Sequence, residues 1–177
     1  LARASLRDTD LLLGGWTLQR LDADGGSLYR TRFGSALAGS GPQDFELQLA
    51  LRATQPLLLQ GDTGFSRKGP DETQASHYLS EPQLAVQGTL RRAVQSLPVS
   101  GRAWLDHEWS DQLMHPEAVG WDWIGMNLDD GAALTAFRLR RADGSSLWAG
   151  GSWRTVGGAL QAFDAHSVRF TPGRIWA

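Results

Sequence analysis

The stretch that decides the fold reads Gly101-Arg102-Ala103-Trp104-Leu105-Asp106-His107-Glu108-Trp109 and resumes, after a mixed segment at 110–119, as Gly120-Trp121-Asp122-Trp123-Ile124-Gly125-Met126-Asn127-Leu128. It holds four of the chain's eight tryptophans beside an acid, imidazole, acid run. So much aromatic surface beside so many ionisable groups is unusual for a solvated segment. We therefore predict that both halves are β-strands that carry the functional site, with 110–119 as a loop between them.

In the first predicted strand, successive side chains point to opposite faces of the sheet. This alternation places Trp104, Asp106 and Glu108 on one face. His107 and Trp109 lie on the opposite face. The two carboxylates are then about 7 Å apart, from a rise of roughly 3.3 Å per residue. That spacing leaves room for a water molecule or a substrate atom between an acid and its partner base.

The second predicted strand carries an acid among apolar side chains. Trp121, Trp123 and Asn127 share one face, whereas Asp122 shares the other with Ile124 and further apolar residues. A carboxylate in such a row must be paired, hydrogen-bonded or kept protonated, because burial raises the pKa of a carboxyl group. A raised carboxyl pKa suits a general acid near neutral pH.

Short alternating segments separated by turn signals follow one another along most of the remaining chain. Strands are predicted at 15–21, 45–51, 83–90, 133–140, 147–155 and 159–163, with turns at 22–26, 129–131, 142–144 and 157–158. Only the first dozen residues leave room for a helix. The pattern predicts an all-β, antiparallel fold that closes into a barrel or packs as a sandwich.

Length and composition exclude several classes of protein. At 177 residues and 19.3 kDa, the chain has the size of one domain. Its 17 basic and 19 acidic residues are nearly balanced, so nucleic acid is a poor candidate partner. The absence of cysteine excludes disulfides and thiolate metal sites. There is no signal peptide or membrane-length apolar run, but the chain begins at Leu1, and we expect it to be a piece of a longer protein.

Four ordered motifs carry a resemblance to a known family. They are Gly64-Phe65-Ser66-Arg67-Lys68-Gly69, Ala75-Ser76-His77-Tyr78-Leu79-Ser80, the run from Ala103 to Trp109, and Gly120-Trp121-Asp122-Trp123 through Leu128-Asp129-Asp130-Gly131. Together they resemble the AttH-like proteins, known as predicted secreted hydrolases, which share a domain with carotenoid 1,2-hydratase (hydroxyneurosporene synthase). The hydratases carry an arginine and an aspartate where this chain has His107 and Glu108.

The resemblance implies a lipocalin-like (calycin-type) antiparallel β-barrel or, where strands are missing, a strongly curved incomplete sheet. Residues 1–177 would be a single lipocalin-like β-domain, a fragment of a protein with two such domains in tandem behind an export signal. The missing second β-domain would then be a partner of this one. The family implies a periplasmic or secreted location, with membrane association only through segments absent here.

The residues favour acid and base chemistry, hydration or hydrolysis, on an apolar small molecule. Hydrating an alkene requires a carboxylic acid to protonate carbon, an aromatic face to steady the cation, and a carboxylate to activate water. The catalytic candidates are Asp106, Glu108, Asp122 and His107. The substrate-binding candidates are Trp104, Trp109, Trp121, Trp123, Lys68, His77, Tyr78 and Asn127. Neither a metal nor a cofactor is predicted.

Three alternatives stay open beside the enzyme. The domain could be a lipocalin-like carrier that binds an apolar ligand without transforming it. It could be a scaffold for its missing neighbour. In the simplest alternative, the tryptophans fill the core and the acids pair with Arg102, Arg138 or Arg140 on the sheet surface. A zinc site that uses His107 and its neighbouring acids would need ligands from both faces of one strand, which disfavours it.

Overall fold

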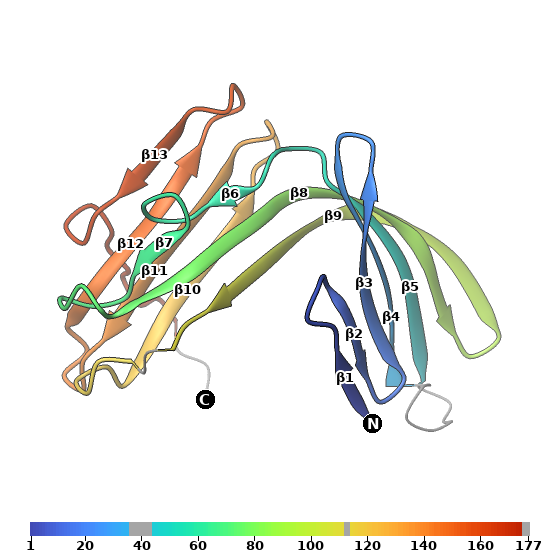
Figure 1. Ribbon diagram of the computed structural model, residues 1–177, viewed down its shortest axis with the longest axis horizontal. Helices are drawn as coiled ribbons and strands as arrows, with labels where there is room; N and C mark the ends of the chain where they lie inside the picture. The colour runs from blue at the N-terminus through green and yellow to red at the C-terminus, as the bar shows by residue number, and fades with distance from the viewer. Residues whose placement is uncertain (36–43, 112–113, 175–177) are drawn as a thin grey trace. The chain divides into compact units, whose positions relative to one another are not determined.

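The computed structural model describes residues 1–35, 44–111 and 114–174, and these residues form β-strands almost throughout. Figure 1 shows the strands in chain order. Their bounds are β1 (Ala2–Ala4), β2 (Asp10–Leu13), β3 (Trp16–Ala23), β4 (Gly26–Phe33), β5 (Phe45–Arg52), β6 (Leu58–Leu59), β7 (Phe65–Arg67), β8 (Ala75–Arg92), β9 (Gln95–Trp109), β10 (Gly120–Asn127), β11 (Ala133–Arg140), β12 (Ser146–Arg154) and β13 (Leu160–Phe163).

The chain divides into two compact units. Unit 1 comprises Leu1–Pro56 and Gln83–Ala103, and unit 2 comprises Leu57–Pro82 and Trp104–Ala177. Strands β8 and β9 contribute residues to both units. The prediction that residues 1–177 form a single domain stays a prediction.

The two sheets are antiparallel, which confirms the predicted all-β class. One sheet contains β1 to β9 and the other has the order β10-β11-β12-β13. Among the described residues, neither sheet returns to its first strand, so neither closes into a barrel. Of the two predicted forms, a closed barrel and an incomplete curved sheet, the structure shows open sheets. In these residues we find no helix with the length and apolar character of a membrane span.

Unit 1 begins as a meander in which each strand pairs with the next. The first dozen residues form β1 and β2, so the suggestion of a helix there was wrong. A local turn decides this: Gly14, with a φ of 63°, reverses the chain between Leu13 and Trp16, which face each other across β2 and β3. A φ in this range suits glycine, which has no Cβ to clash with the backbone. Tyr29 and Leu84 are the most buried large side chains of this unit, 4% and 1% exposed.

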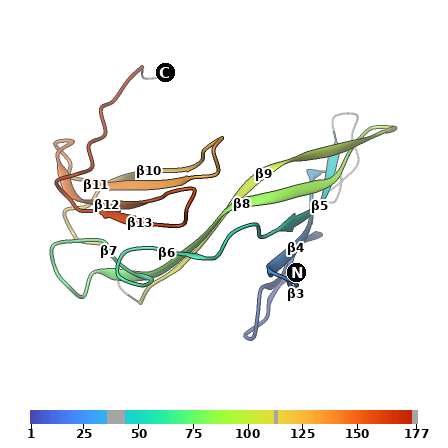
Figure 2. The ribbon, with the colours of Figure 1, turned by 90° about the horizontal axis from the view of Figure 1, so that it is seen from above.

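The strands of unit 2 form two layers (Figure 2), and a polar network joins them. The β10–β13 sheet forms one layer, and β6, β7 and the unit 2 parts of β8 and β9 form the other. Gln60, which follows β6, donates to Ser80 and Thr135, both at 3.0 Å, and accepts a hydrogen bond from Ser152 at 2.7 Å. All four side chains are at most 2% exposed. Buried polar groups are tolerated when every partner is supplied, so this network fixes the two layers in one register.

Candidate active site

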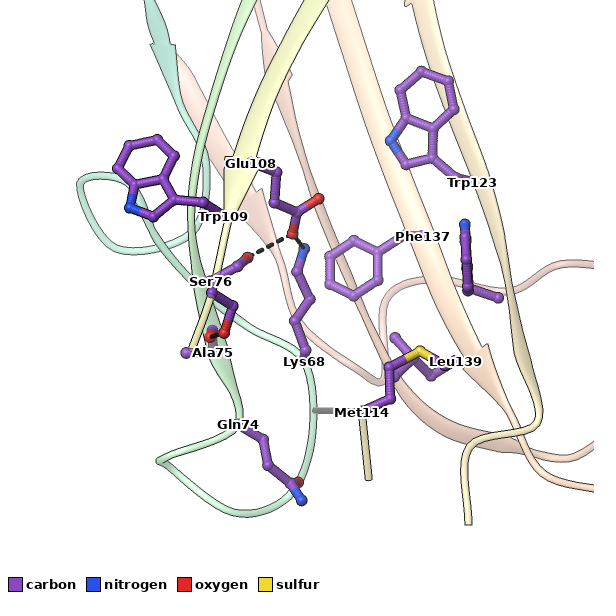
Figure 3. A pocket seen from close by; sticks show the side chains of 12 residues that line it. Lys68, Gln74, Ala75, Ser76, Glu108, Trp109, Met114, Trp123, Phe137 and Leu139 are labelled. Carbon is purple, nitrogen blue, oxygen red and sulfur yellow. Dashed lines mark hydrogen bonds and ion pairs between the residues drawn. The ribbon is translucent and has the colours of Figure 1, made fainter. Parts of the chain in front are cut away.

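Unit 2 contains a cavity of about 300 Å³ with aromatic walls and ionisable groups along one side (Figure 3). It is lined by Lys68, Gln74, Ala75, Ser76, Glu108, Trp109, Ser110, Met114, Trp121, Trp123, Phe137 and Leu139. An apolar pocket with a few convergent polar groups is the usual form of a small-molecule site. Five residues predicted from the sequence lie in its wall: Lys68, Glu108, Trp109, Trp121 and Trp123.

Lys68 follows directly on β7 and extends its amine toward Glu108 (Figure 3). Nζ lies 2.8 Å from Glu108 Oε1 and donates to Ser66 Oγ at 3.2 Å. It also lies over the rings of Tyr78 and Phe137, 4.6 Å and 4.1 Å from their centroids. Burial lowers the pKa of Lys68, and the carboxylate of Glu108 offsets this only in part.

Glu108 lies on β9 and receives hydrogen bonds from two sides. Ser76 Oγ of β8 donates to Oε1 at 2.5 Å, and the same oxygen faces Lys68. The carboxylate keeps 39% of its side chain exposed, so one end of this ion pair contacts solvent while the amine is only 20% exposed. A carboxylate in this position can exchange protons both with water and with a ligand in the cavity.

Asp106 belongs to the same face of β9 but has a different environment. Its Oδ1 accepts hydrogen bonds from Ser80 Oγ at 2.6 Å and from Trp104 Nε1 at 2.8 Å. Because Ser76 and Ser80 share one face of β8, the predicted common face of Asp106 and Glu108 is confirmed. Asp106 does not line the cavity. The two acids therefore share a face of β9 but have different hydrogen-bond partners.

Tyr78 and Trp123 connect the two layers behind the cavity. Trp123 Nε1 of β10 donates to the Tyr78 hydroxyl at 3.0 Å. Tyr78 is 3% exposed, and burial, followed by the charge of Asp106, raises its pKa well above the ordinary value. The phenol therefore keeps its proton. The indoles of Trp104 and Trp123 meet edge to face at 6.5 Å, above Gly125, where a Cβ would lie 2.6 Å from the Trp123 ring.

Asp122 lies outside the cavity. Its Oδ2 accepts hydrogen bonds from Arg138 Nη2 at 2.6 Å and Nε at 3.0 Å. Arg140 Nε lies 3.2 Å from Oδ1, within ion-pair distance, although it has no hydrogen-bond partner. For this acid the structure shows the pairing with arginine that the sequence left open as an alternative.

His107, Trp109 and His77 form a ladder on the other face of the β8–β9 pair, although Trp109, the last residue of β9, also belongs to the cavity lining. The imidazole of His77 stacks on Trp109 at 5.3 Å, and His107 tilts against the same indole at 5.0 Å. Phe65, opposite His77 in the β7–β8 register, meets the His77 ring at 6.2 Å. The predicted orientation of His107 away from the flanking acids is confirmed, and neither histidine lines the cavity. Asn127, at the end of β10 opposite Ala133, also lies apart from the cavity lining.

The sequence did not predict three residues that contact the Lys68–Glu108 pair. Ser76 and Phe137 line the cavity, and Ser66, outside its lining, accepts a hydrogen bond from the amine. One signal was available: Ser76, Tyr78 and Ser80 alternate along β8, so they share a face. Phe137 gave no such signal, because an apolar residue in a buried strand is ordinary core.

A second cavity in unit 2, of about 540 Å³, contains none of the residues predicted from the sequence. Phe137 lies in the walls of both cavities. Trp148 and Arg67 form part of the second wall, with the guanidinium 4.8 Å over the indole. The ion pair in this wall, Arg67 with Glu72, is long at 3.9 Å, and the Glu72 side chain is 91% exposed, whereas Lys68 and Glu108 meet at 2.8 Å. The smaller cavity is therefore the candidate site.

Comparison with known proteins identifies a family and similar solved structures. The AttH-like family model matches residues 1–177. An AttH homologue from Nitrosomonas europaea is 45% identical, with a TM-score of 0.85, over 98% of this chain and 51% of that chain. Kievitone hydratase from Nectria haematococca is 15% identical, with a TM-score of 0.63, over 88% of this chain and 45% of that one. The second likeness shows the lipocalin-like fold alone, and no curated protein matches. The chain spans about half the length of both solved structures.

Proposed function

The chain belongs to the AttH-like family, and on that premise we propose that it is an acid–base enzyme, a hydratase or a hydrolase, for an apolar small molecule bound in the cavity of unit 2. One observation carries the proposal: the Glu108 carboxylate, held by Ser76 and Lys68, lies in the wall of a cavity whose other lining residues are mainly apolar and include aromatic rings. Such a pair can take up and release protons beside a desolvated substrate.

Each residue of the pair has a defined role in this proposal. Glu108 is the general base that removes a proton from water or from the substrate, and later returns it. Lys68 holds the carboxylate in place through its 2.8 Å contact, and its lowered pKa lets it share the proton. Trp121 and Trp123 contact the apolar part of the substrate, and their indole faces steady a developing positive charge. Asp106 is a positioning residue through Ser80 and Trp104.

The test measures transfer of oxygen from labelled water. The protein is incubated with a panel of apolar alkenes, enones and esters in H₂¹⁸O, and the products are analysed by mass spectrometry. We expect incorporation that Glu108→Gln abolishes while ligand binding, followed by tryptophan fluorescence, is retained. Asp122→Asn is the matched control, since it alters a carboxylate of unit 2 that lies outside the cavity.

The carrier remains the second candidate because of the wide aromatic rim. Trp121 and Trp123 are 62% and 43% exposed, a surface that could hold an apolar ligand without any chemistry. This candidate predicts saturable binding with no product from any member of the panel. It also predicts that Trp121→Ala or Trp123→Ala weakens binding, whereas Glu108→Gln does not.

The protein outside this chain is part of the same proposal. We propose that a second β-domain accompanies the chain and that the whole acts in the periplasm or outside the cell. Support comes from the family resemblance and from the coverage of about half of each solved structure.

A further inference from the structure

We propose that Lys68 forms a covalent imine with its substrate, so that the substrate class is an apolar aldehyde or ketone. This inference deepens the proposed function and rests on it for the choice of cavity.

Lys68 is the only lysine in the sequence, and the other 16 of the 17 lysine and arginine residues are arginines. An arginine stays protonated and does not attack a carbonyl, whereas an amine in a desolvated pocket can become neutral and nucleophilic. The single lysine is also the basic residue that lines the aromatic cavity. Burial, which lowers its pKa, acts in the direction that nucleophilic attack requires.

The neighbours of Nζ match the needs of imine formation. Glu108 Oε1, at 2.8 Å, is close enough to accept a proton from the ammonium. Ser66 Oγ, at 3.2 Å, fixes the amine from another side. The rings of Tyr78 and Phe137, within 4.6 Å and 4.1 Å, stabilise a cation on this nitrogen. An iminium is also a cation, so these rings would stabilise the adduct as they stabilise the ammonium.

The step balances without any added oxidant or metal. Glu108 takes one proton from the ammonium, and the neutral amine attacks the carbonyl carbon, which breaks the C–O π bond and leaves a negative charge on oxygen. A second proton then moves from the attacking nitrogen to that oxygen, which gives the hydroxyl of a neutral carbinolamine. Glu108 then protonates that hydroxyl, which leaves as water, and an iminium remains. Because the iminium acidifies the adjacent C–H bond, Glu108 can remove that proton to give an enamine. If a hydroxyl stands on the next carbon, it leaves with the proton from Glu108 as a second water.

Hydrolysis of the conjugated iminium then releases the unsaturated carbonyl compound and free Lys68. The net change is dehydration of a β-hydroxy carbonyl compound, and the reverse sequence hydrates a conjugated double bond. The imine therefore supplies a physical route to the hydratase chemistry proposed for this site.

Reductive trapping tests the inference. The purified protein is mixed with phenylpropanal and sodium cyanoborohydride, digested with a protease that cuts at arginine, and mapped by mass spectrometry. We expect one phenylpropyl group per chain on Lys68, formed in preference to the α-amino group of the first residue. Phenylpropanol, which has no carbonyl group, should compete for the cavity and slow the labelling.

Three comparisons make the result decisive. In urea, the preference for Lys68 over the α-amino group should vanish, since it depends on the folded cavity. Glu108→Gln should slow labelling at least about tenfold, as loss of a general base does, while Asp122→Asn should label like the wild type. Folded wild-type protein whose Lys68 stays unlabelled, or labels no faster than in urea, overturns the inference.

The same experiment separates this inference from the proposed function. If Lys68 is not trapped but labelled oxygen still enters a product through Glu108, the imine is wrong and the acid–base enzyme stands. If Lys68 is trapped but no product forms with any member of the panel, the imine stands and the proposed enzyme fails.

Discussion

The sequence predicted both Glu108 and Asp122 as catalytic acids. Each forms an ion pair in unit 2, but the cations of the two pairs differ. Glu108 meets the amine of Lys68 at 2.8 Å, beside a cavity. Asp122 meets the guanidinium of Arg138 at 2.6 Å, with Arg140 at 3.2 Å. A guanidinium is always charged and binds a carboxylate through a rigid fork, whereas a buried amine can give up its proton. The pair at Asp122 is therefore structural, and the pair at Glu108 is suited to chemistry.

The comparison teaches that an acid beside tryptophan is not by itself a catalytic signal. Asp122 lies between Trp121 and Trp123 in the sequence, yet the alternation of β10 turns it away from both indoles toward β11. Arg138 lies directly opposite Asp122 in the register of the two strands. Glu108 instead finds its cation on a loop from another part of unit 2.

We expect the greatest loss of activity from a change at Glu108. Glu108→Gln removes the general base, and we expect turnover to fall by about 10² to 10⁴. Asp122→Asn should leave turnover within about threefold, since it removes no group that contacts the substrate. The measurement is kcat for any substrate identified in the labelled-water assay. Equal losses in both variants would show that the distinction between the two pairs is wrong.

The uncharged hydrogen-bond network around Gln60 joins the two layers of unit 2, so we expect its loss to lower stability. Ser152→Ala leaves the buried Gln60 Oε1 without its donor, and we expect the free energy of unfolding to drop by about 2 kcal/mol. Urea unfolding monitored by tryptophan fluorescence measures this. Ser145→Ala, on the exposed turn before β12, is the control and should change stability by less than about 0.5 kcal/mol. A loss at Ser152 no greater than that of the control would contradict the role of the network.

Removing the guanidinium tests the structural side of the comparison. Arg138→Met leaves Asp122 with Arg140 alone, and we expect a loss of about 1 to 2 kcal/mol, between the values for exposed and buried pairs. The side chains of Arg138 and Asp122 are 13% and 32% exposed, which places the pair between these limits. Urea unfolding of the two single variants and the double variant with Asp122→Asn isolates the coupling. Additive losses would show that the pair contributes nothing.

The smallest effect concerns the pH dependence of stability at Lys68. Because burial lowers the pKa of Lys68, the unfolded chain binds more protons than the folded chain between that value and the ordinary lysine pKa of about 10.4. Stability of the wild type should therefore rise with pH across this window relative to Lys68→Met. Unfolding of both proteins is compared below about pH 10, since the raised pKa of Tyr78 acts in the opposite direction above it. A difference that stays flat or falls would contradict the lowered pKa.

The fold was largely predictable because strand alternation and turn residues are local signals. The strands predicted at 133–140, 147–155 and 159–163 correspond to β11, β12 and β13, with glycine turns between them. The four motifs also identified the family, which the match over residues 1–177 confirms. The helix suggested near the first residues was wrong because Gly14 reverses the chain and pairs β2 with β3.

The candidate site was predictable only in part. The face shared by Asp106 and Glu108 followed from the two-residue period of β9, as did the opposite orientation of His107. The cation beside Glu108 did not follow, because Lys68 approaches from a loop that the period of β9 does not constrain.

The sequence by itself determined which side of each strand a residue occupies, since the direction of a side chain is set by the backbone of its own strand. Only the tertiary structure decided which acid met a lysine in an aromatic cavity and which met two arginines on a sheet. Pairing between distant segments depends on how the layers of unit 2 pack, through Gln60 and its partners, and no local pattern encodes that contact. The same packing places the amine of Lys68 near the rings of Tyr78 and Phe137. Burial there lowers its pKa, which the residue type alone does not determine.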